Sequence, residues 1–551
     1  MKKIAELRNI IKQKSIVTKD KQKIYGRDGQ EQSWIFDIKK IILDPMALGI
    51  IVDIFWEKYE GAYPFQVGCQ EVAAIPLVSA IVYKSQQSGK PVSGFFVRKS
   101  RKKDGLQKMI EGDLNDEKIV LVDDIINSGQ TIDRQIKVIE EEGKKVSDVF
   151  SIVSFRDVEG YEFLKKKEIK LSSLFSVSEF GLNMIKEKKD IPHNYFNVLW
   201  RFQSPDPSYY YVMPKSTPAI DDKKVYFGSD SGYFWALNQS DGSVAWKYRV
   251  WWLSQKGIFS SPALFQGNVY FGAYDGNVYC LDKKTGKRKW VFMEADWVGS
   301  SPAIAENLGL LFVGLEFGLF RKKGGIAALN AKTCKKIWEY KMSEFVHCSP
   351  VYLEKKKMVA IGGNDGKMYL LDAKSGRLIW SYQTGGEIKY SPTVDSENKI
   401  ISFGSMDGNL YVLDVDSGKL VYKYKTEAGI YSKPLIIDES VIFSSLDKMI
   451  YSLDLAKKEL NWVFDTSGRV FSSPALIGEN IFVGSNDGRM YELEKQKGTL
   501  CSFFQFTERI TNEIVFNAES KRFFVLTQAN ELYCLARQFS TNLFAKRKSD
   551  S

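Results

Sequence analysis

The sequence predicts two folds in one chain: an α/β domain with a parallel sheet and flanking helices, then an all-β propeller of eight blades. Up to about residue 185, helix-like and strand-like segments alternate, which is typical of a parallel sheet covered by helices. From residue 198 a repeat of about 40–48 residues recurs, and four short strands per repeat make one propeller blade. A chain of 551 residues has room for both folds.

The first domain is expected over residues 1–185, and ligands of such sheets bind at the carboxyl ends of the strands. Its helices are expected at 1–15, 46–59, 72–85 and 131–142, and its strands at 33–38, 65–67, 94–98, 119–122, 149–155 and 173–177. A linker, 186–197, leads to the propeller, 198–540, and a basic, disordered tail is expected over 541–551.

Composition and charge favour a globular, cytoplasmic protein. Charged residues make up 26% of the chain, hydrophobic residues 44%, and the net charge is +11. This charge suits an anionic small ligand, whereas scattered basic residues argue against nucleic-acid binding. The N-terminus has no apolar core of signal-peptide length, and no run of about 18 apolar residues predicts a membrane span. The six cysteines lack zinc-like spacing, as expected of a reduced protein without a structural metal.

The most informative stretch is residues 120–131, which read VLVDDIINSGQT. An apolar run, Ile119–Val122, predicts a buried strand that ends on two carboxylates, Asp123 and Asp124. Carboxylates in this place accept hydrogen bonds from the vicinal hydroxyls of a ribose. A turn of small polar residues then leads into a helix, and its N–H groups and hydroxyls can wrap a 5′-phosphate. The residues of the turn are Asn127, Ser128, Gly129, Gln130 and Thr131.

Two other interpretations of this stretch are an ATP-binding loop and an ordinary strand-turn-helix. An ATP-binding loop would need the pattern GxxxxGK[ST], which the turn lacks. The other is an ordinary strand-turn-helix with acidic residues at its turn. It requires the apolar run, both acids and the small-residue turn to coincide by chance.

The order of strand, acid pair, small-residue loop and helix resembles the signature of the type I phosphoribosyltransferases, which bind phosphoribosyl pyrophosphate (PRPP). Further segments over about residues 1–185 resemble orotate phosphoribosyltransferase in the family's order. Residues 33–39 resemble the family's strand whose aromatic residue lies against the base, and residues 67–73 resemble its loop that holds pyrophosphate. Residues 154–157 resemble the strand end whose arginine binds the orotate carboxylate. The resemblance implies base contacts from Phe36 and Arg156, and PRPP contacts from Gly68, Cys69, Gln70, Asp123, Asp124, Asn127, Ser128, Gly129, Gln130 and Thr131.

The basic segment 96–105 resembles the family's mobile catalytic loop. Transfer at the ribose C1 carbon expels pyrophosphate, and the cations Arg98, Lys99 and Lys102 can close over the charge of this leaving group. Asp104 and Asp124 complete the candidate catalytic set. The family's loop reaches across a dimer, which implies a homodimer, and Mg²⁺ is expected on the pyrophosphate and water without direct protein ligands. A solvated basic turn is the alternative if the loop is taken alone.

Two positions depart from the family's pattern. Asp104 stands where the family has a histidine, and an aspartate among basic residues stays ionised and is a poor acid at neutral pH. Phe155 stands where the family usually has an aspartate before the base-binding arginine. We therefore expect transfer of ribose 5-phosphate to a pyrimidine-like base or another nitrogen acceptor. The alternative is a PRPP or nucleotide sensor without turnover, whose propeller is an interaction scaffold.

The second half repeats Ser-x-Pro, an aromatic-rich run ending in Gly, an Asp-Gly turn, a Tyr-x-Leu-Asp strand, a Gly turn and an aromatic residue. Asp-Gly turns close hairpins because Gly accepts positive φ. The segment 198–202 looks like a blade's last strand but precedes the first repeat, so it is expected to complete the eighth blade and close the ring. The residues expected to fill the gaps between blades are Trp246, Trp290, Trp338, Trp380, Trp462 and, in one copy, Tyr422.

This half resembles the quinoprotein-type propellers, whose repeat also occurs in an outer-membrane assembly lipoprotein. The resemblance implies the fold and no particular activity. The adjacent cysteine pair associated with quinone-cofactor dehydrogenases is missing from the sequence, and no acid cluster for Ca²⁺ stands out. Pyrroloquinoline quinone is therefore not expected as a cofactor.

The position three residues before each repeat's proline is expected to face the central channel of the propeller. A channel mouth with aromatic and basic residues suits a nucleotide, another small ligand, a peptide or an acidic protein partner. The alternative is that these side chains only pack the funnel. The residues at this position include Lys215, Phe259, His347, Lys389, Tyr431 and Phe471.

Overall fold

A computed structural model divides the chain into two compact units, Met1–Asp190 and Ile191–Ser551. Most of the expected linker and all of the expected tail lie outside the described residues, and the last two linker positions belong to strand β9 (Phe196–Gln203). The structure describes residues 2–18, 34–70, 74–98, 108–127, 129–155, 161–180, 182, 195–205, 216–250, 257–318 and 323–538.

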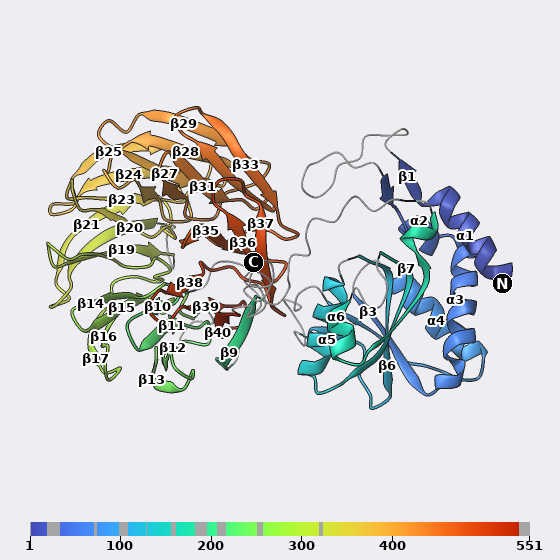
Figure 1. Cartoon of the computed structure of the whole chain (residues 1–551). Helices are drawn as coiled ribbons and strands as arrows, with labels where there is room; N and C mark the ends of the chain where they lie inside the picture. Colours follow the sequence, from blue (N-terminus) through green and yellow to red (C-terminus); the bar gives the residue numbers. More distant parts are fainter. Residues whose placement is uncertain are drawn as a thin grey trace, which may run out of the picture. The chain divides into compact units, whose positions relative to one another are not determined.

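The first unit has the predicted α/β fold (Figure 1). Its six-stranded sheet has the order β5-β4-β3-β6-β7-β8 and is parallel except for β5. Its strands are β3 (Phe65–Gln70), β4 (Gly94–Val97), β5 (Ile110–Glu111), β6 (Lys118–Ile126), β7 (Val146–Ser154) and β8 (Lys170–Ser176), and β1 (Ile16–Thr18) with β2 (Trp34–Phe36) forms a separate antiparallel pair. Its helices are α1 (Lys2–Lys14), α2 (Lys39–Ile42), α3 (Pro45–Tyr59), α4 (Ile75–Gln87), α5 (Gln130–Glu141) and α6 (Glu162–Lys166), with 3₁₀ turns η1 (Glu60–Ala62) and η3 (Val177–Phe180).

Both faces of this sheet are apolar, and helices cover both of them. Along β6, Val120 and Val122 belong to one buried cluster together with residues of α1, α3 and α4. Ile119 and Leu121 belong to a second cluster with residues of α5 and α6. The alternation follows from the two-residue period of a strand, and Figure 1 shows the two sets of helices on opposite sides of the sheet.

Four of the α-helices and β-strands of the first unit, β1, β5, α2 and α6, were not predicted, nor were the 3₁₀ turns. Each has five residues or fewer, and the periodic signal of so short a segment is too weak to separate it from a loop. Strand β6 is longer than predicted because it pairs with β7 as far as Ile126, so Asp123 and Asp124 lie inside the strand and not after its end. The remaining predicted elements are found with shifted ends. Within the described parts of the chain, every helix is too short or too polar to cross a lipid bilayer.

The second unit is a propeller of eight four-stranded antiparallel sheets, as predicted (Figure 1). The first four blades are β10–β13 (Ala219–Ile220, Lys224–Gly228, Tyr233–Asn238, Val244–Arg249), β14–β17 (Ala263–Phe265, Asn268–Gly272, Val278–Asp282, Arg288–Phe292), β18–β21 (Ala303–Ala305, Leu310–Phe317, Lys323–Asn330, Lys336–Met342) and β22–β25 (Val351–Leu353, Met358–Gly362, Lys367–Asp372, Leu378–Gln383). The next four are β26–β29 (Thr393–Val394, Ile400–Gly404, Asn409–Asp414, Leu420–Lys425), β30–β33 (Leu435–Ile437, Ser440–Ser444, Met449–Asp454, Glu459–Asp465), β34–β37 (Ala475–Ile477, Asn480–Gly484, Arg489–Glu494, Leu500–Gln505) and β38–β40 (Val515–Asn517, Arg522–Leu526, Glu531–Arg537) with β9.

Both ends of this unit close the ring. Strand β9 pairs antiparallel with β40, from Phe196 opposite Arg537 to Gln203 opposite Glu531. Residues that precede the first blade therefore supply the last strand of the eighth, which confirms the closure predicted from 198–202. The eighth blade would otherwise lack its outer strand and expose the edge of β40.

Aromatic residues on the outer strands of seven blades bind the next blade, as predicted for six of them. The indole N–H of Trp380, for example, donates to the carbonyl of Val415 in the following blade at 2.7 Å. Gly418 in that turn has φ +66, and a Cβ there would come 2.7 Å from the Trp380 ring, which explains the Gly of the repeat. The donor–carbonyl pairs are Trp200–Gln239, Trp246–Lys283, Trp290–Ala331, Trp338–Ala373, Trp380–Val415, Tyr422–Lys458 and Trp462–Lys495.

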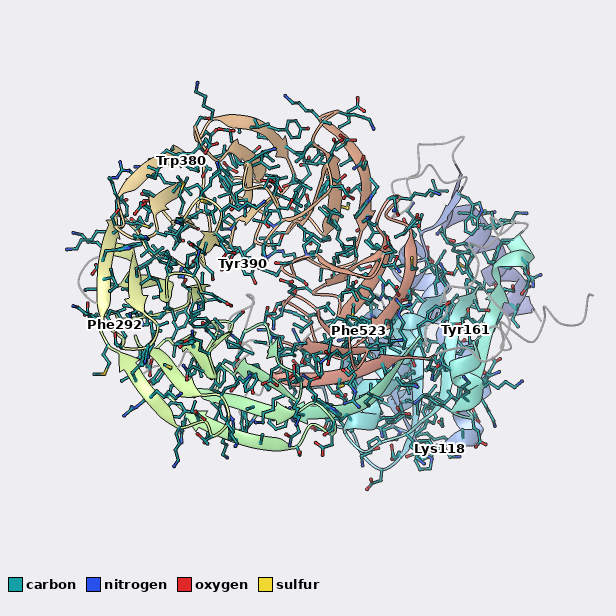
Figure 2. All side chains as sticks on the ribbon, turned by 60° about the vertical axis from the view of Figure 1, so that its left-hand side comes forward. Lys118, Tyr161, Phe292, Trp380, Tyr390 and Phe523 are labelled. Carbon is teal, nitrogen blue, oxygen red and sulfur yellow. The ribbon has the colours of Figure 1, made fainter. Side chains whose placement is uncertain are left out.

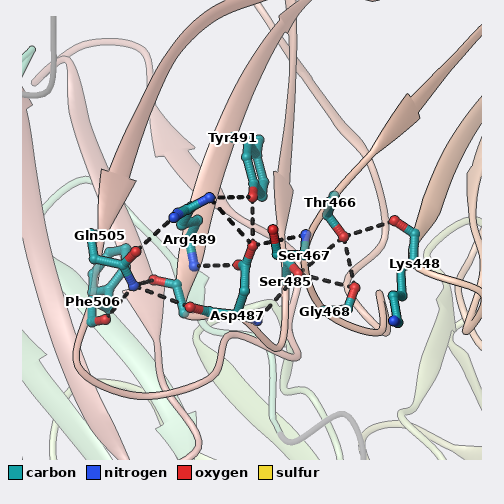
Figure 3. A network of polar contacts seen from close by, with 11 residues as sticks. Lys448, Thr466, Ser467, Gly468, Ser485, Asp487, Arg489, Tyr491, Gln505 and Phe506 are labelled. Atoms are coloured by element: carbon teal, nitrogen blue, oxygen red, sulfur yellow. Dashed lines mark hydrogen bonds and ion pairs between the residues drawn. The ribbon is translucent and has the colours of Figure 1, made fainter. Parts of the chain in front are cut away.

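The aspartates of the Asp-Gly turns make a second contact between blades. Asp487 accepts hydrogen bonds from the Tyr491 hydroxyl at 2.5 Å and from the Arg489 backbone N–H at 2.9 Å, both in its own blade (Figure 3). It also accepts one from the backbone N–H of Ser467 in the preceding blade at 3.2 Å. One carboxylate thus closes its hairpin and ties it to its neighbour. The same Asp–Tyr pair recurs at Asp275–Tyr279, Asp365–Tyr369, Asp407–Tyr411 and Asp447–Tyr451.

Candidate active site

Strands β3 and β6 separate at the carboxyl end of the sheet, where the strand order reverses. β3 pairs with β4 as far as Gln70–Val97, but with β6 only as far as Gly68–Leu121. The chain leaves β3 for β4 on one side and returns to β6 on the other, so this is the topological switch point. In open α/β sheets, ligands bind in the crevice at such a point. The acid pair follows Leu121 by two residues and therefore lies at this crevice.

Asp123 and Asp124 each use a carboxylate oxygen to bind the next backbone N–H. The Asp124 N–H donates to Asp123 Oδ1 at 3.0 Å, and the Ile125 N–H donates to Asp124 Oδ1 at 2.8 Å. Burial, and after it the charge of Asp124, raises the pKa of Asp123 well above its usual value. The pair can therefore keep a proton at a pH where an exposed aspartate is ionised. Such a pair can both donate to and accept from the two hydroxyls of a ribose.

The N-terminus of α5 follows the acid pair and begins at a glycine. Gly129 is the N-cap residue with φ +79 and has no side chain to occupy the first N–H groups of the helix. Free N–H groups at a helix N-terminus form an anion site. Asn127 and Thr131 are exposed on either side of Gly129, whereas Ser128 and the side chain of Gln130 lie outside the described residues. The predicted phosphate turn is thus adjacent to the predicted ribose acids.

The turn around Gly129 is packed from one side by two aromatic residues. A Cβ at Gly129 would come 2.7 Å from the Phe163 ring and 3.0 Å from the Tyr161 ring. Tyr161 is buried and donates its hydroxyl to the carbonyl of Ile126 at 2.8 Å, which fixes the strand end before the turn. This support was not predicted, because no sequence pattern near residue 161 links it to residue 126.

Gly129→Ala is expected to destabilise the first unit by about 1–3 kcal/mol, because it combines a strained positive φ with a clash. Gly143→Ala is the matched control: Gly143 also has a positive φ, +75, but nothing lies within 4 Å of the point that its Cβ would occupy. Thermal melting of both full-length variants separates the two effects. Equal losses for the two variants would show that the aromatic contact at Gly129 contributes nothing.

The stem of the predicted catalytic loop joins β4 to β5. Phe96 pairs with Glu111 across this hairpin, and the Arg98 N–H donates to the Met109 carbonyl at 2.8 Å. The Arg98 guanidinium lies 3.3 Å from Glu111, and the buried Arg134 of α5 donates to the Arg98 carbonyl at 3.2 Å. Arg98 therefore holds the stem of the loop. Lys99, Lys102 and Asp104 lie outside the described residues.

Glu111 and Arg134 were not predicted as part of the site. Glu111 ends a strand of two residues, and its pairing with Arg98 depends on that strand's register. Arg134 is an arginine within an amphipathic helix, where a buried position cannot be told from an exposed one by residue type. Only the fold brings both side chains to the base of the loop.

The predicted pyrophosphate residues Gly68, Cys69 and Gln70 lie within β3 and not in the loop after it. A Cβ at Gly68 would come 2.2 Å from the Phe95 ring, so the glycine is needed for packing against β4, and its contact with PRPP stays a prediction. Cys69 is fully buried, and burial raises the pKa of its thiol to about 12. The loop residues 71–73 lie outside the described residues.

The two aromatic residues of β2 have different neighbours. Phe36 is only 9% exposed, and its ring lies 5.3 Å from that of Phe180. Trp34 is more exposed and stacks on Phe155, with ring centroids 5.9 Å apart and an interplanar angle of 28°. Phe155 thus packs against an aromatic ring where the family's pattern has an aspartate. The base contact of Phe36 stays a prediction, and Arg156 lies outside the described residues.

A separate cavity of about 210 Å³ lies in the channel of the propeller. Four of the predicted channel residues line it, namely Phe259, His347, Lys389 and Tyr431. Phe471 packs against Tyr431, with ring centroids 5.6 Å apart, and Lys215 lies outside the described residues. Figure 2 shows Tyr390, another lining residue, at the centre of the ring of blades.

Comparison with known proteins identifies the first unit. Residues 56–183 match the family described as phosphoribosyl transferase domain. Orotate phosphoribosyltransferase of Aquifex aeolicus (strain VF5) is 30% identical over 175 residues, which is 32% of this chain and 95% of the relative. The chain belongs to the orotate phosphoribosyltransferase family. The enzyme of the same name from Pyrococcus furiosus is 31% identical over 154 residues, 27% of this chain and 81% of the relative.

The propeller is an addition to the orotate phosphoribosyltransferase domain and has its own relatives. Residues 197–346 match the family of the outer membrane protein assembly factor BamB, and residues 321–551 match the propeller of the beta-alanine-activating enzyme. BamB from Moraxella catarrhalis has a TM-score of 0.50 and 21% identity, covering 63% of this chain and 98% of its own. Quinohemoprotein alcohol dehydrogenase from Comamonas testosteroni has a TM-score of 0.52 and 14% identity, covering 62% and 76%. These likenesses show the fold alone.

Proposed function

We propose that the first unit transfers ribose 5-phosphate from PRPP to a pyrimidine-like base or another nitrogen acceptor. The observation that carries this proposal is the acid pair Asp123–Asp124 at the switch point, followed closely by the N-terminus of α5. Carboxylates suit the ribose hydroxyls, and free helix N–H groups suit the 5′-phosphate. The family match over residues 56–183 supports the same assignment.

The reaction requires the ribose to be positioned and the charge on the leaving pyrophosphate to be stabilised. The acid pair and the turn Asn127–Thr131 hold the ribose, so that C1 faces the acceptor. The bond from C1 to the pyrophosphate oxygen breaks, the bond from C1 to the acceptor nitrogen forms, and the acceptor proton leaves to solvent. Arg98 is paired with Glu111, so we assign it to positioning the loop and leave the leaving group to Lys99 and Lys102.

Mg²⁺ is proposed to enter with PRPP. The described residues contain no group of three histidine, cysteine or acidic side chains that could hold a metal ion. The pyrophosphate oxygens and water then supply its ligands, which suits the preference of Mg²⁺ for oxygen and for retained water. When bound, the ion neutralises charge on the leaving pyrophosphate.

We propose an acceptor other than orotate. The stack of Trp34 on Phe155 makes this end of the site more apolar than the aspartate of the family's pattern would. An apolar group there leaves polar atoms of a bound base without a partner, which discriminates strongly between related substrates. We also propose that the chain forms a homodimer through the first unit, as the family does. The propeller is proposed to recognise a partner or ligand.

The test is exchange of labelled pyrophosphate into PRPP, with Mg²⁺ and a panel that includes orotate, uracil and modified pyrimidines. We expect exchange that depends on one base of the panel and is weak with orotate. Binding of PRPP by calorimetry without exchange on any base would favour the sensor alternative. Absence of PRPP binding would remove both functions.

A further inference from the structure

A belt of hydroxyl side chains surrounds the channel of the propeller, one from nearly every blade. The Thr217 N–H donates to Ser261 Oγ at 2.9 Å, and the Ser261 N–H donates to Ser301 Oγ at 2.9 Å. The Ser301 N–H continues to Ser349 Oγ at 2.8 Å. Each of these residues directly precedes the proline of its repeat. In the eighth blade the proline is replaced by an isoleucine, Ile514. The eight belt positions are Thr217, Ser261, Ser301, Ser349, Ser391, Lys433, Ser473 and Glu513.

Lys433 and Glu513 replace the hydroxyl in the sixth and eighth blades and bring opposite charges to the belt. Both line the cavity of about 210 Å³. The backbone of Lys433 keeps the belt geometry, since its N–H donates to Ser473 Oγ at 3.0 Å. The substitution therefore adds a charged side chain to the channel without changing the path of the main chain.

These two charges differ from the others in the channel because no described residue neutralises them by direct contact. Lys389 lies 2.7 Å from Glu387, and His347 lies 2.9 Å from Glu316. In the described parts of the chain, no hydrogen bond or ion pair reaches the Lys433 ammonium or the Glu513 carboxylate. Burial raises the pKa of Glu513, and the charge of Lys433 offsets part of this rise. A buried charged group without a partner raises the free energy of the folded protein, unless a ligand, ion or water forms hydrogen bonds with it.

Aromatic rings form the wall beside these charges. The Tyr390 and Tyr431 rings lie with centroids 6.0 Å apart, and Tyr431 continues to Phe471 at 5.6 Å. Burial, with the charge of Glu513 added to it, raises the pKa of Tyr390 to about 12, so its ring stays a neutral phenol. Neutral aromatic faces attract ammonium groups and pack against apolar ones.

We propose that the channel binds a small zwitterion of the amino-acid type, with its ammonium on Glu513, its carboxylate on Lys433 and its apolar part against Tyr390 and Tyr431. A ligand with one charge would leave the second belt charge without a partner. A cavity of about 210 Å³ is smaller than the roughly 300–1,000 Å³ of sites for drug-sized ligands, which argues against a dinucleotide or a large cofactor. The proposal does not depend on phosphoribosyl transfer.

The first experiment is calorimetry on the full-length protein without PRPP. The probes are the standard L-amino acids at millimolar concentration and, for each amino acid that binds, its analogues without the carboxylate or without the ammonium. For L-phenylalanine these analogues are phenethylamine and 3-phenylpropanoate. We expect at least one amino acid to bind, and its analogues without carboxylate or ammonium to bind at least about tenfold more weakly. The proposal is overturned if no amino acid binds, or if single-charge analogues bind as tightly as the zwitterion.

The second experiment uses Lys433→Met and Glu513→Gln, with melting curves to verify folding. Each is expected to weaken amino-acid binding by about 10–100-fold, and Glu513→Gln should remove the preference for the zwitterion over the carboxylate analogue. The matched controls are Lys419→Met and Glu479→Gln, which change the same charges at exposed positions. Unchanged binding in both channel variants would overturn the proposal. If a variant fails to fold, the analogue comparison on the unmodified protein decides.

Discussion

Asp123→Asn is expected to raise the melting temperature of the first unit while it lowers phosphoribosyl transfer by about 10–100-fold. The pKa of Asp123 is raised by burial and by Asp124, so its ionised form is disfavoured in the folded protein. An asparagine has no such form, and its Oδ1 can still accept from the Asp124 N–H, a bond of 3.0 Å in the native protein. Activity falls because an amide cannot ionise, whereas the acid pair can give up its proton when PRPP binds and then accept hydrogen bonds from both ribose hydroxyls.

The pH dependence of this stabilisation has a fixed sign. Below the ordinary pKa of an aspartate, Asp123 is protonated in both folded and unfolded chains, so variant and native protein should melt alike. As the pH rises through that value towards the raised pKa, the unfolded chain ionises first, and the variant gains its advantage. Melting curves across this range measure the effect. A variant that melts lower than the native protein at neutral pH would contradict the assignment.

The control for this variant is Asp116→Asn. Asp116 is exposed and pairs with Lys144 at 2.5 Å in the same unit, away from the crevice. It should leave both transfer and melting nearly unchanged, since exposed ion pairs contribute little. Loss of transfer in the control as well would point to a general effect of lowered charge.

Asp487→Ala is expected to destabilise the propeller by about 2–4 kcal/mol. The substitution leaves the buried hydroxyl of Tyr491 and the N–H groups of Arg489 and Ser467 without their acceptor (Figure 3). One of these N–H groups belongs to the neighbouring blade, so the seam between two blades is weakened as well as one hairpin. Chemical denaturation followed by tryptophan fluorescence measures the loss.

Two further variants separate the parts of this effect. Asp416→Ala removes an exposed aspartate that pairs with Lys356, and it should cost less than about 1 kcal/mol. Tyr491→Phe removes the hydroxyl alone, and in the double variant with Asp487→Ala the losses should not add, because the two side chains contact each other. Additive losses would mean that the Asp487–Tyr491 bond does not contribute.

Much of the fold could be predicted because its signals are local and repeated. The apolar run before Asp123 fixes a buried strand, and each Ser-x-Pro and Asp-Gly turn marks a blade. The position of residues 198–202 ahead of the first repeat was enough to predict ring closure. The short elements β1, β5, α2 and α6 could not be predicted, since two to five residues give too weak a periodic signal to separate them from a loop.

The sites were predictable to the extent that their residues lie close together in the sequence. Asp123, Asp124 and Gly129 are neighbours in the chain and are neighbours in the structure. The partners of Arg98 come from β5 and α5, and only the tertiary fold brings them to the loop. Lys433 and Glu513 are 80 positions apart in the sequence, and only the fold shows that both side chains line the same cavity.

The strand that closes the propeller has a consequence for the order of events during synthesis. Arg201 of β9 pairs with Glu531 of β40, a contact that spans 330 positions of the chain. The first unit is complete before any blade exists and can fold while the rest is being made. Strand β9, however, waits for its partner until the last blade leaves the ribosome. A transcript truncated within that blade would yield a folded enzyme domain that carries an open, edge-exposed ring prone to association with other copies.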